Sequence, residues 1–190
     1  LTCATLLIRK AGDPIVYVLQ QYFLPEKRVE HLEDKNTNEA PYRKWADRGL
    51  LTICPGNRVN YSDVTAWFCQ MRDEWKIDAI KVGYDRALAG YWVDEMKSNG
   101  FDMEAVAQGP YTWSQPMREM GAALEAKQIN YNGNPILVWC LTNTAVKKSG
   151  LNNIQPVKIT DKRRIDGAVS LLNAWVMYVK YFEDFMYAVG

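Results

Sequence analysis

The sequence has few of the residues that most catalytic and metal sites use. Its 190 residues include one histidine, His31, in an acidic stretch where a solvated side chain is expected. The 4 cysteines form no C-x-x-C pair, so a structural zinc site of the usual spacing is excluded. A Gly-x-Ser-x-Gly sequence is also missing. Without it, and without a second histidine, a hydrolase triad has no credible base.

Long apolar runs and a strong net charge are missing as well. The longest nearly uncharged stretch, residues 167–179, falls short of the roughly 20 apolar residues that a membrane-spanning helix needs. With 23 Lys and Arg against 22 Asp and Glu, the net charge is only +1, so any basic surface must be local. Apolar residues make up 48% of the chain, which is typical of a soluble globular protein. We expect one domain, residues 1–190, cut from a longer protein, since Leu1 begins neither a signal peptide nor a natural start.

The cysteines are expected to be small buried side chains. Apolar neighbours surround Cys140 in particular, and such surroundings favour a free thiol in a reducing compartment. Their number alone leaves paired disulfides as an alternative.

Patterns of apolar residues predict alternating strands and helices. Two strand-like runs separated by Gly12 and Asp13 predict a β-hairpin. Ser114 and Pro116 suit an N-cap and a first helical turn, so a helix is expected to begin there. Residues 25–49 are expected to form a surface excursion with two short helices. The expected elements are strands at 2–8, 14–23, 79–84 and 103–107, helices at 62–75 and 87–98 and from 114 and 166, a strand or buried helix at 135–142, and a loop or hairpin at 147–161.

This order predicts the fold class. Strands that first pair as a hairpin and then alternate with helices give an α/β fold, a mixed β-sheet flanked by helices.

Two carboxylates stand out by their positions. Asp85 directly follows the predicted strand 79–84, at the end of a strand where open α/β sheets present functional groups. Asp166 lies in the first turn of an apolar helix, after three consecutive cations. Each has a simpler explanation, because Asp caps helices and complements the positive end of the helix dipole. A catalytic role requires the two side chains, 81 residues apart, to converge.

A basic segment lies beside the second carboxylate. Between Leu141 and Asp166 the net charge is +4, which leaves −3 for the rest of the chain. Such a segment is usually a solvated loop. Beside a carboxylate pair it is what a phosphodiester nuclease needs, since cations hold the DNA backbone while acids hold metal. The candidate DNA-binding residues are Lys147, Lys148, Lys158, Lys162, Arg163 and Arg164.

The chain resembles the nuclease domain of the large terminase subunit of tailed bacteriophages over essentially its whole length. Any one matching stretch is weak, but their order and spacing together are specific. These stretches are residues 22–30 (YFLPEKRVE), 41–46 (PYRKWA), 49–57 (GLLTICPGN), 83–85 (GYD), 115–120 (QPMREM), 134–139 (NPILVW) and 164–169 (RIDGAV).

The resemblance implies an RNase H-like fold with an acidic cluster that binds two divalent cations, Mg²⁺ or Mn²⁺. Asp85 and Asp166 match the second and the last metal-binding acids of the family, so both are candidate catalytic and metal-binding residues. In the family the first acid lies on a strand just before the segment that matches residues 1–4, and that strand is absent from this sequence. The ATPase domain is missing too, since no Gly-x-x-x-x-Gly-Lys-[Ser/Thr] loop occurs.

The activity implied is cutting of concatemeric phage double-stranded DNA during genome packaging. The implied partners are DNA, the portal protein and the small terminase subunit, with no membrane. The implied location is the cytoplasm of the infected or lysogenic bacterial host, outside the mature virion. A second hypothesis is a catalytically silent docking module whose aromatic C-terminal helix, with Trp175, Tyr178, Tyr181 and Phe182, engages the portal or another packaging subunit.

Overall fold

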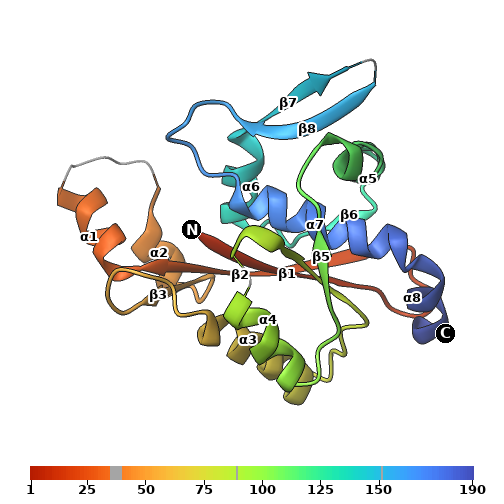
Figure 1. The fold of residues 1–190 in the computed structure, drawn as a ribbon, viewed down its shortest axis with the longest axis horizontal. Helices are drawn as coiled ribbons and strands as arrows, with labels where there is room; N and C mark the ends of the chain where they lie inside the picture. The colour runs from red at the N-terminus through yellow and green to blue at the C-terminus, as the bar shows by residue number, and fades with distance from the viewer. Residues whose placement is uncertain (35–39, 89, 151) are drawn as a thin grey trace.

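A computed structural model describes residues 1–34, 40–88, 90–150 and 152–190 as a mixed sheet between two groups of helices (Figure 1). Its first half contains β1 (Thr2–Ile8), β2 (Val16–Pro25), α1 (Glu26–Asp34), α2 (Tyr42–Asp47), β3 (Leu51–Cys54), α3 (Tyr61–Asp73), β4 (Val82–Asp85), a 3₁₀ turn η1 (Arg86–Leu88) and α4 (Gly90–Ser98). Its second half contains β5 (Met103–Val106), α5 (Pro110–Glu125), β6 (Ile129–Asn130), α6 (Pro135–Thr142), β7 (Thr144–Ser149), β8 (Asn153–Lys158), α7 (Asp166–Lys180) and α8 (Phe182–Val189).

The central sheet grows from the β1–β2 hairpin. The two strands pair antiparallel from Thr2 opposite Phe23 to Ile8 opposite Tyr17. Gly12 adopts a φ of +71° in the turn, and Asp13 Oδ1 accepts the backbone N–H of Ile15 at 2.9 Å. β3 and β6 both pair parallel with β2, on the edge that β1 leaves free. The predicted hairpin and mixed sheet are therefore confirmed.

Strands β4 and β5 form a separate parallel pair, with Asp85 opposite Val106. In the described part of the chain no strand ladder joins β1 to β4. Instead, a cavity of about 350 Å³ lies between them, lined on one side by β1 residues such as Thr5 and on the other by β4 residues such as Tyr84. Helix α7 contacts both β1 and β4 and so bridges the two sheets.

Helices cover both faces of the sheet. In Figure 1, α3 and α4 lie on one side of the β1–β2 hairpin, and α5, α6 and α7 lie on the other. Phe23 and Leu6 pack toward α3 and α4, whereas Val16 and Val18 pack toward α5 and α7. The alternation follows from the pleat of a strand, because successive side chains point to opposite faces.

Several local expectations need correction. Helix α5 begins at Pro110 after Gly109, so Ser114 and Pro116 lie inside it and do not start it. Ser114 is buried, and its Oγ accepts the backbone N–H of Ile154 at 2.8 Å, so the hydroxyl binds strand β8 and caps no helix. The N-cap of α3 is Asn60, one residue before the helix, where Ser62 or Asp63 was expected.

The excursion after β2 belongs partly to the core. It contains the two expected short helices, α1 and α2, although residues 35–39 of the expected segment lie outside the described residues. Val29, Tyr42 and Trp45 are buried. Trp45 and Tyr42 also make ring contacts with Trp139 of α6.

Other expectations hold. Of the two alternatives for residues 135–142, the structure shows the buried helix α6, and strands β7 and β8 pair as an antiparallel hairpin. All 4 cysteines are free, and each lies in the described part of the chain. Cys54 and Cys140 are buried as expected, whereas Cys3 and Cys69 are only half-buried. No described helix is long and apolar enough to cross a bilayer.

Candidate active site

Asp85 is the last residue of strand β4. Its Oδ1 accepts the backbone N–H of Ala87 at 2.9 Å and so opens the 3₁₀ turn η1. The capping explanation thus accounts for one carboxylate oxygen. The side chain is half-buried and lines the cavity between β1 and β4.

Gly83, two residues earlier, lets helix α7 approach β4 closely. A Cβ at this position would lie 2.7 Å from Met177 Cγ and 3.0 Å from Val106 Cγ2, so both side chains would have to move. The Gly-Tyr-Asp sequence therefore combines a packing residue with a carboxylate.

Asp166 is the first residue of α7. The preceding residue, Ile165, is the N-cap and makes no side-chain capping bond. A negative charge in the first turn complements the helix dipole, and the half-buried Asp166 side chain also lines the cavity. The fold thus brings Asp85 and Asp166, distant in sequence, to the wall of one cavity.

These two carboxylates are hard oxygen donors of the kind that Mg²⁺ and Mn²⁺ prefer. Among the described residues there is no group of three or more His, Cys, Asp or Glu side chains placed to hold a metal ion. This stretch of chain therefore supplies only part of a conventional metal shell. The nearby thiols add nothing, because burial raises the pKa of Cys3 and of Cys140 to about 12 and keeps both protonated at neutral pH.

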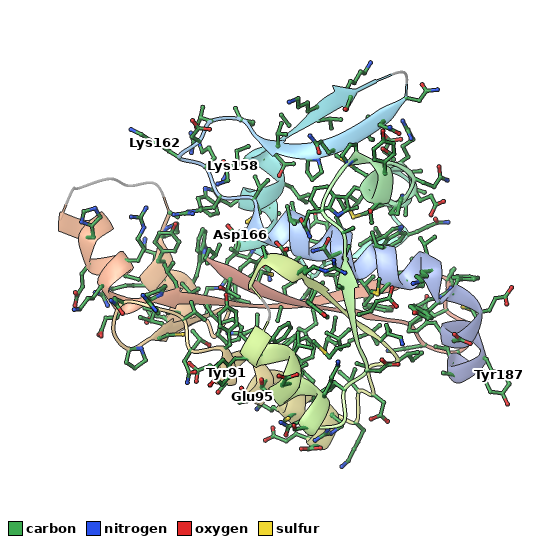
Figure 2. The ribbon with its side chains drawn as sticks, in the orientation of Figure 1. Tyr91, Glu95, Lys158, Lys162, Asp166 and Tyr187 are labelled. Atoms are coloured by element: carbon green, nitrogen blue, oxygen red, sulfur yellow. The ribbon has the colours of Figure 1, made fainter. Side chains whose placement is uncertain are left out.

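The cationic residues lie on the hairpin β7–β8 and on the segment that leads to α7. Lys158 ends β8 and lines the same cavity as the two carboxylates. Figure 2 shows Lys158 and Lys162 on the segment that leads toward Asp166. Lys162 and Arg163 are exposed, whereas Arg164 is half-buried and its backbone carbonyl accepts Asn143 Nδ2–H at 3.1 Å.

Lys147 and Lys148 do not lie on the same face of the hairpin, so they cannot both belong to one basic surface with Lys158. Both are exposed on β7, but they are consecutive residues of a strand and so project from opposite faces of the hairpin. At most one of them can share a face with Lys158. The hairpin itself is anchored to α5, because Arg118 donates a hydrogen bond to the carbonyl of Asn152.

Sequence reasoning missed a polar cluster beneath Asp166. Gln20 and Tyr22 on β2, Thr5 on β1, and Gly167 and Ser170 on α7 are joined by hydrogen bonds. The sequence contains one signal that could have indicated this cluster. Gln20 occupies the inward position of a strand whose other inward residues include Val16 and Val18, and a buried polar residue there needs partners.

The model of the family "Terminase large subunit, endonuclease domain" matches residues 1–181. The chain belongs to this family. In this terminase nuclease domain, the motif residues Gly83 and Asp85 lie on β4, and Asp166 and Gly167 begin α7.

Individual proteins are similar to the chain over most of its length. Protein YmfN of Escherichia coli (strain K12) is 30% identical over 149 residues, covering 77% of this chain and 32% of that protein. The large terminase subunit of Enterobacteria phage HK97 is 26% identical over 175 residues, covering 88% of this chain and 33% of that protein. The chain thus spans about a third of the length of these relatives.

Solved structures show the same fold. The crystal structure of the HK97 large terminase superposes with a TM-score of 0.79 at 24% identity, covering 93% of this chain and 36% of that one. The large terminase nuclease from the thermophilic phage G20c superposes with a TM-score of 0.51 at 15% identity, covering 66% of this chain and 65% of that one. The expected RNase H-like fold is therefore confirmed.

Proposed function

We propose that residues 1–190 form one domain that acts as a metal-dependent endonuclease and cuts concatemeric phage double-stranded DNA during genome packaging. The observation that carries the proposal is that Asp85 and Asp166 line the same cavity, with Lys158 on its wall. A carboxylate pair beside phosphate-attracting cations is the arrangement that phosphodiester hydrolysis requires.

Asp85 and Asp166 would hold the divalent ions, Mg²⁺ or Mn²⁺, through their carboxylate oxygens. Two such ions, when bound, activate a water molecule and stabilise the leaving oxygen of the phosphodiester. The residues of this chain present the carboxylates from rigid elements, the end of a strand and the first turn of a helix, and so limit their motion.

The cations have the complementary role. Lys158, Lys162 and Arg163 attract the DNA backbone toward a cavity whose carboxylates would otherwise repel it. Contacts to phosphate position the duplex without reading its sequence, which suits an enzyme that cuts many sequences. The portal protein and the small terminase subunit are the proposed protein partners, and the proposed location is the cytoplasm of the bacterial host.

The strand that the family resemblance implies would lie in this cavity. Strand β1 pairs with β2 on one edge and β4 pairs with β5 on one edge, and their other edges face the cavity. An extended segment between them would satisfy both edges and bring a further acid to Asp85 and Asp166. We therefore propose that the complete site includes such a strand.

Nicking of supercoiled plasmid, with and without Mn²⁺, tests the proposed activity. Conversion to open-circle DNA only when Mn²⁺ is present supports a metal-dependent nuclease. Plasmid that stays supercoiled, both with the 190-residue chain and with a chain extended by the proposed strand, contradicts it.

One observation supports the docking hypothesis. Helix α8 has no buried residue, and Tyr187 on it is 91% exposed at the far end of the molecule from Asp166 (Figure 2). In contrast, Trp175 is buried, and Tyr178 makes ring contacts with Trp175, Phe182 and Phe185. Most of these aromatic side chains therefore pack within the protein. If Tyr187→Ser and Phe182→Ser abolish portal binding and plasmid is never nicked, the docking hypothesis replaces the nuclease.

Replacing Lys162, Arg163 and Arg164 by Ala is expected to weaken the binding of unrelated duplexes about equally. The slope of log K against log salt concentration should flatten by roughly 0.9 for each phosphate that is no longer neutralised. Fluorescence anisotropy at several salt concentrations measures this. The matched control replaces three exposed lysines on other segments of the chain, Lys76, Lys97 and Lys127, and should keep the original slope. An unchanged slope in the first variant would mean that the run is only a solvated segment.

A further inference from the structure

A chain of hydrogen bonds runs from the sheet to the first turn of α7. Tyr22 Oη donates to Gln20 Oε1 at 2.6 Å. Gln20 Nε2 donates both to the carbonyl oxygen of Gly167 at 3.0 Å and to Thr5 Oγ1 at 2.9 Å. Ser170 Oγ lies 2.7 Å from Thr5 Oγ1 and donates to the carbonyl of Cys3 at 3.1 Å.

The direction of each hydrogen bond in this network follows from the number of available protons. Ser170 uses its one hydroxyl proton on the carbonyl of Cys3, so Thr5 is the donor to Ser170 Oγ. Thr5 is then free to accept from Gln20, and both amide protons of Gln20 are used. Because every donor has an acceptor, the network has one arrangement and holds β1, β2 and α7 in one relative position.

Gly167, the residue after Asp166, is where this network contacts the first turn of the helix. A Cβ on Gly167 would overlap Tyr22 Oη and would lie 3.0 Å from two ring carbons of Tyr22. Tyr22 is fully buried and cannot swing away. Only glycine therefore allows the first turn of α7 to rest on the Tyr22 hydroxyl.

We infer that Gln20 and Tyr22 are positioning residues for Asp166. They fix the backbone of the adjacent Gly167 and so aim the Asp166 carboxylate into the cavity between β1 and β4. This inference rests on the proposed role of Asp166 as a metal ligand. It assigns a function to two buried residues, Gln20 at 4% and Tyr22 at 0% exposure, that do not themselves bind metal.

The protonation state of Tyr22 suits this role. Burial raises the pKa of Tyr22 well above its ordinary value, and the nearby charge of Asp166 raises it further. The hydroxyl therefore stays protonated and keeps donating to Gln20 throughout the neutral and alkaline range.

Titration of the 190-residue chain with Mn²⁺ alone, followed by the electron paramagnetic resonance signal of free Mn²⁺, tests the inference. The titration covers high Mn²⁺ and protein concentrations, because two carboxylates alone form a weak site whose further weakening must still be measurable. Tyr22→Phe removes the donor and Gln20→Met removes the amide at similar size. Each is expected to lower Mn²⁺ affinity by about 10-fold, the usual effect of losing a group that orients a metal ligand. Asp166→Asn, measured in parallel, reports on the ligand itself.

A matched control separates positioning from general loss of stability. Trp113 Nε1 donates to Asn173 Oδ1 at 3.0 Å, a buried bond to the same helix, about two turns beyond Asp166. Trp113→Phe should lower the thermal midpoint and leave Mn²⁺ affinity unchanged. If it lowers Mn²⁺ affinity as much as Tyr22→Phe does, the effect is structural and the inference is wrong.

Gly167→Ala supplies a second test that does not depend on the Gln20 variant folding. Alone, it should lower Mn²⁺ affinity by at least about 10-fold, because the first turn must move away from Tyr22. Tyr22→Phe removes the hydroxyl that the new Cβ would overlap, although the Cβ would still lie 3.0 Å from two ring carbons. The double variant should therefore lose less Mn²⁺ affinity than the sum of the two single losses. Additive losses would overturn the inference.

The outcomes also distinguish the inference from the proposed function. If Asp166→Asn lowers Mn²⁺ affinity but Tyr22→Phe and Gln20→Met do not, only the inference is wrong. If Asp166→Asn itself has no effect, the proposed metal site is wrong and the inference is wrong with it.

Discussion

Asp166→Asn and Asp85→Asn are each expected to reduce Mn²⁺-dependent nicking of supercoiled plasmid by at least about 100-fold. Replacing a metal-binding carboxylate by an amide removes the negative charge that holds the ion, and this exceeds the roughly 10- to 100-fold effect typical of residues that only orient a ligand. The rate of open-circle formation at a fixed Mn²⁺ concentration that does not saturate the original protein measures the loss, in the chain extended by the proposed strand.

The two amide substitutions are chosen so that the fold survives. The Asp85→Asn side chain would retain an oxygen that can accept the backbone N–H of Ala87, so the cap of η1 persists. Asp161→Asn is the matched control, because Asp161 is exposed and lies outside the cavity. The assignment of both acids would be contradicted if all three variants nicked at the rate of the original protein.

Filling the cavity between β1 and β4 with an extended segment is expected to raise both stability and metal affinity. Each apolar side chain buried there contributes about 1.5–3 kcal/mol, and a protein of this size gains roughly 2–4 °C in thermal midpoint per kcal/mol. A strand with two such inward side chains should therefore raise the midpoint by at least about 5 °C. If the strand also carries an Asp directed at Asp166, Mg²⁺ affinity should rise by at least about 10-fold.

Three versions of the 190-residue chain separate these effects. One carries an N-terminal extension with alternating apolar residues and an Asp, the second has Asn in place of that Asp, and the third has Pro residues that cannot pair with a strand edge. The first two should gain the same stability, and only the first should gain Mg²⁺ affinity in calorimetry. The third should match the unextended chain, for which weak Mg²⁺ binding is expected because two carboxylates make a poor Mg²⁺ site.

Two results would contradict the proposal that a further strand fills the cavity and completes the metal site. Tight binding of two Mg²⁺ ions by the unextended chain would show that residues 1–190 already form a complete site. Equal thermal midpoints for all three extended versions would show that the cavity does not accept a strand.

The sequence alone determined the elements whose signals are local. Gly12 and Asp13 indicated the hairpin turn, because turn chemistry involves residues a few positions apart. Residues 135–142 remained a strand or a buried helix, and the structure shows the helix, with Asn134 as its N-cap. The apolar stripe of α7 was also visible, since its period of about 3.6 residues is independent of what the helix packs against. Asp85 and Asp166 stood out by their positions after a predicted strand and at the start of an apolar helix, and the family resemblance implied a metal-binding role for both.

Only the tertiary structure shows which residues of other elements these helices and strands contact. Ser114 has the chemistry of an N-cap, but Ile154, 40 residues away, donates to its hydroxyl, and α5 begins at Pro110 instead. The four-residue strand β3 went unrecognised because its stability comes from pairing with β2, not from its own sequence. The shared cavity of Asp85 and Asp166, and the contact of Gly167 with Tyr22, likewise join residues that lie far apart in sequence. Such contacts arise from the packing of α7 across β1 and β4, and no periodicity within a single segment encodes them.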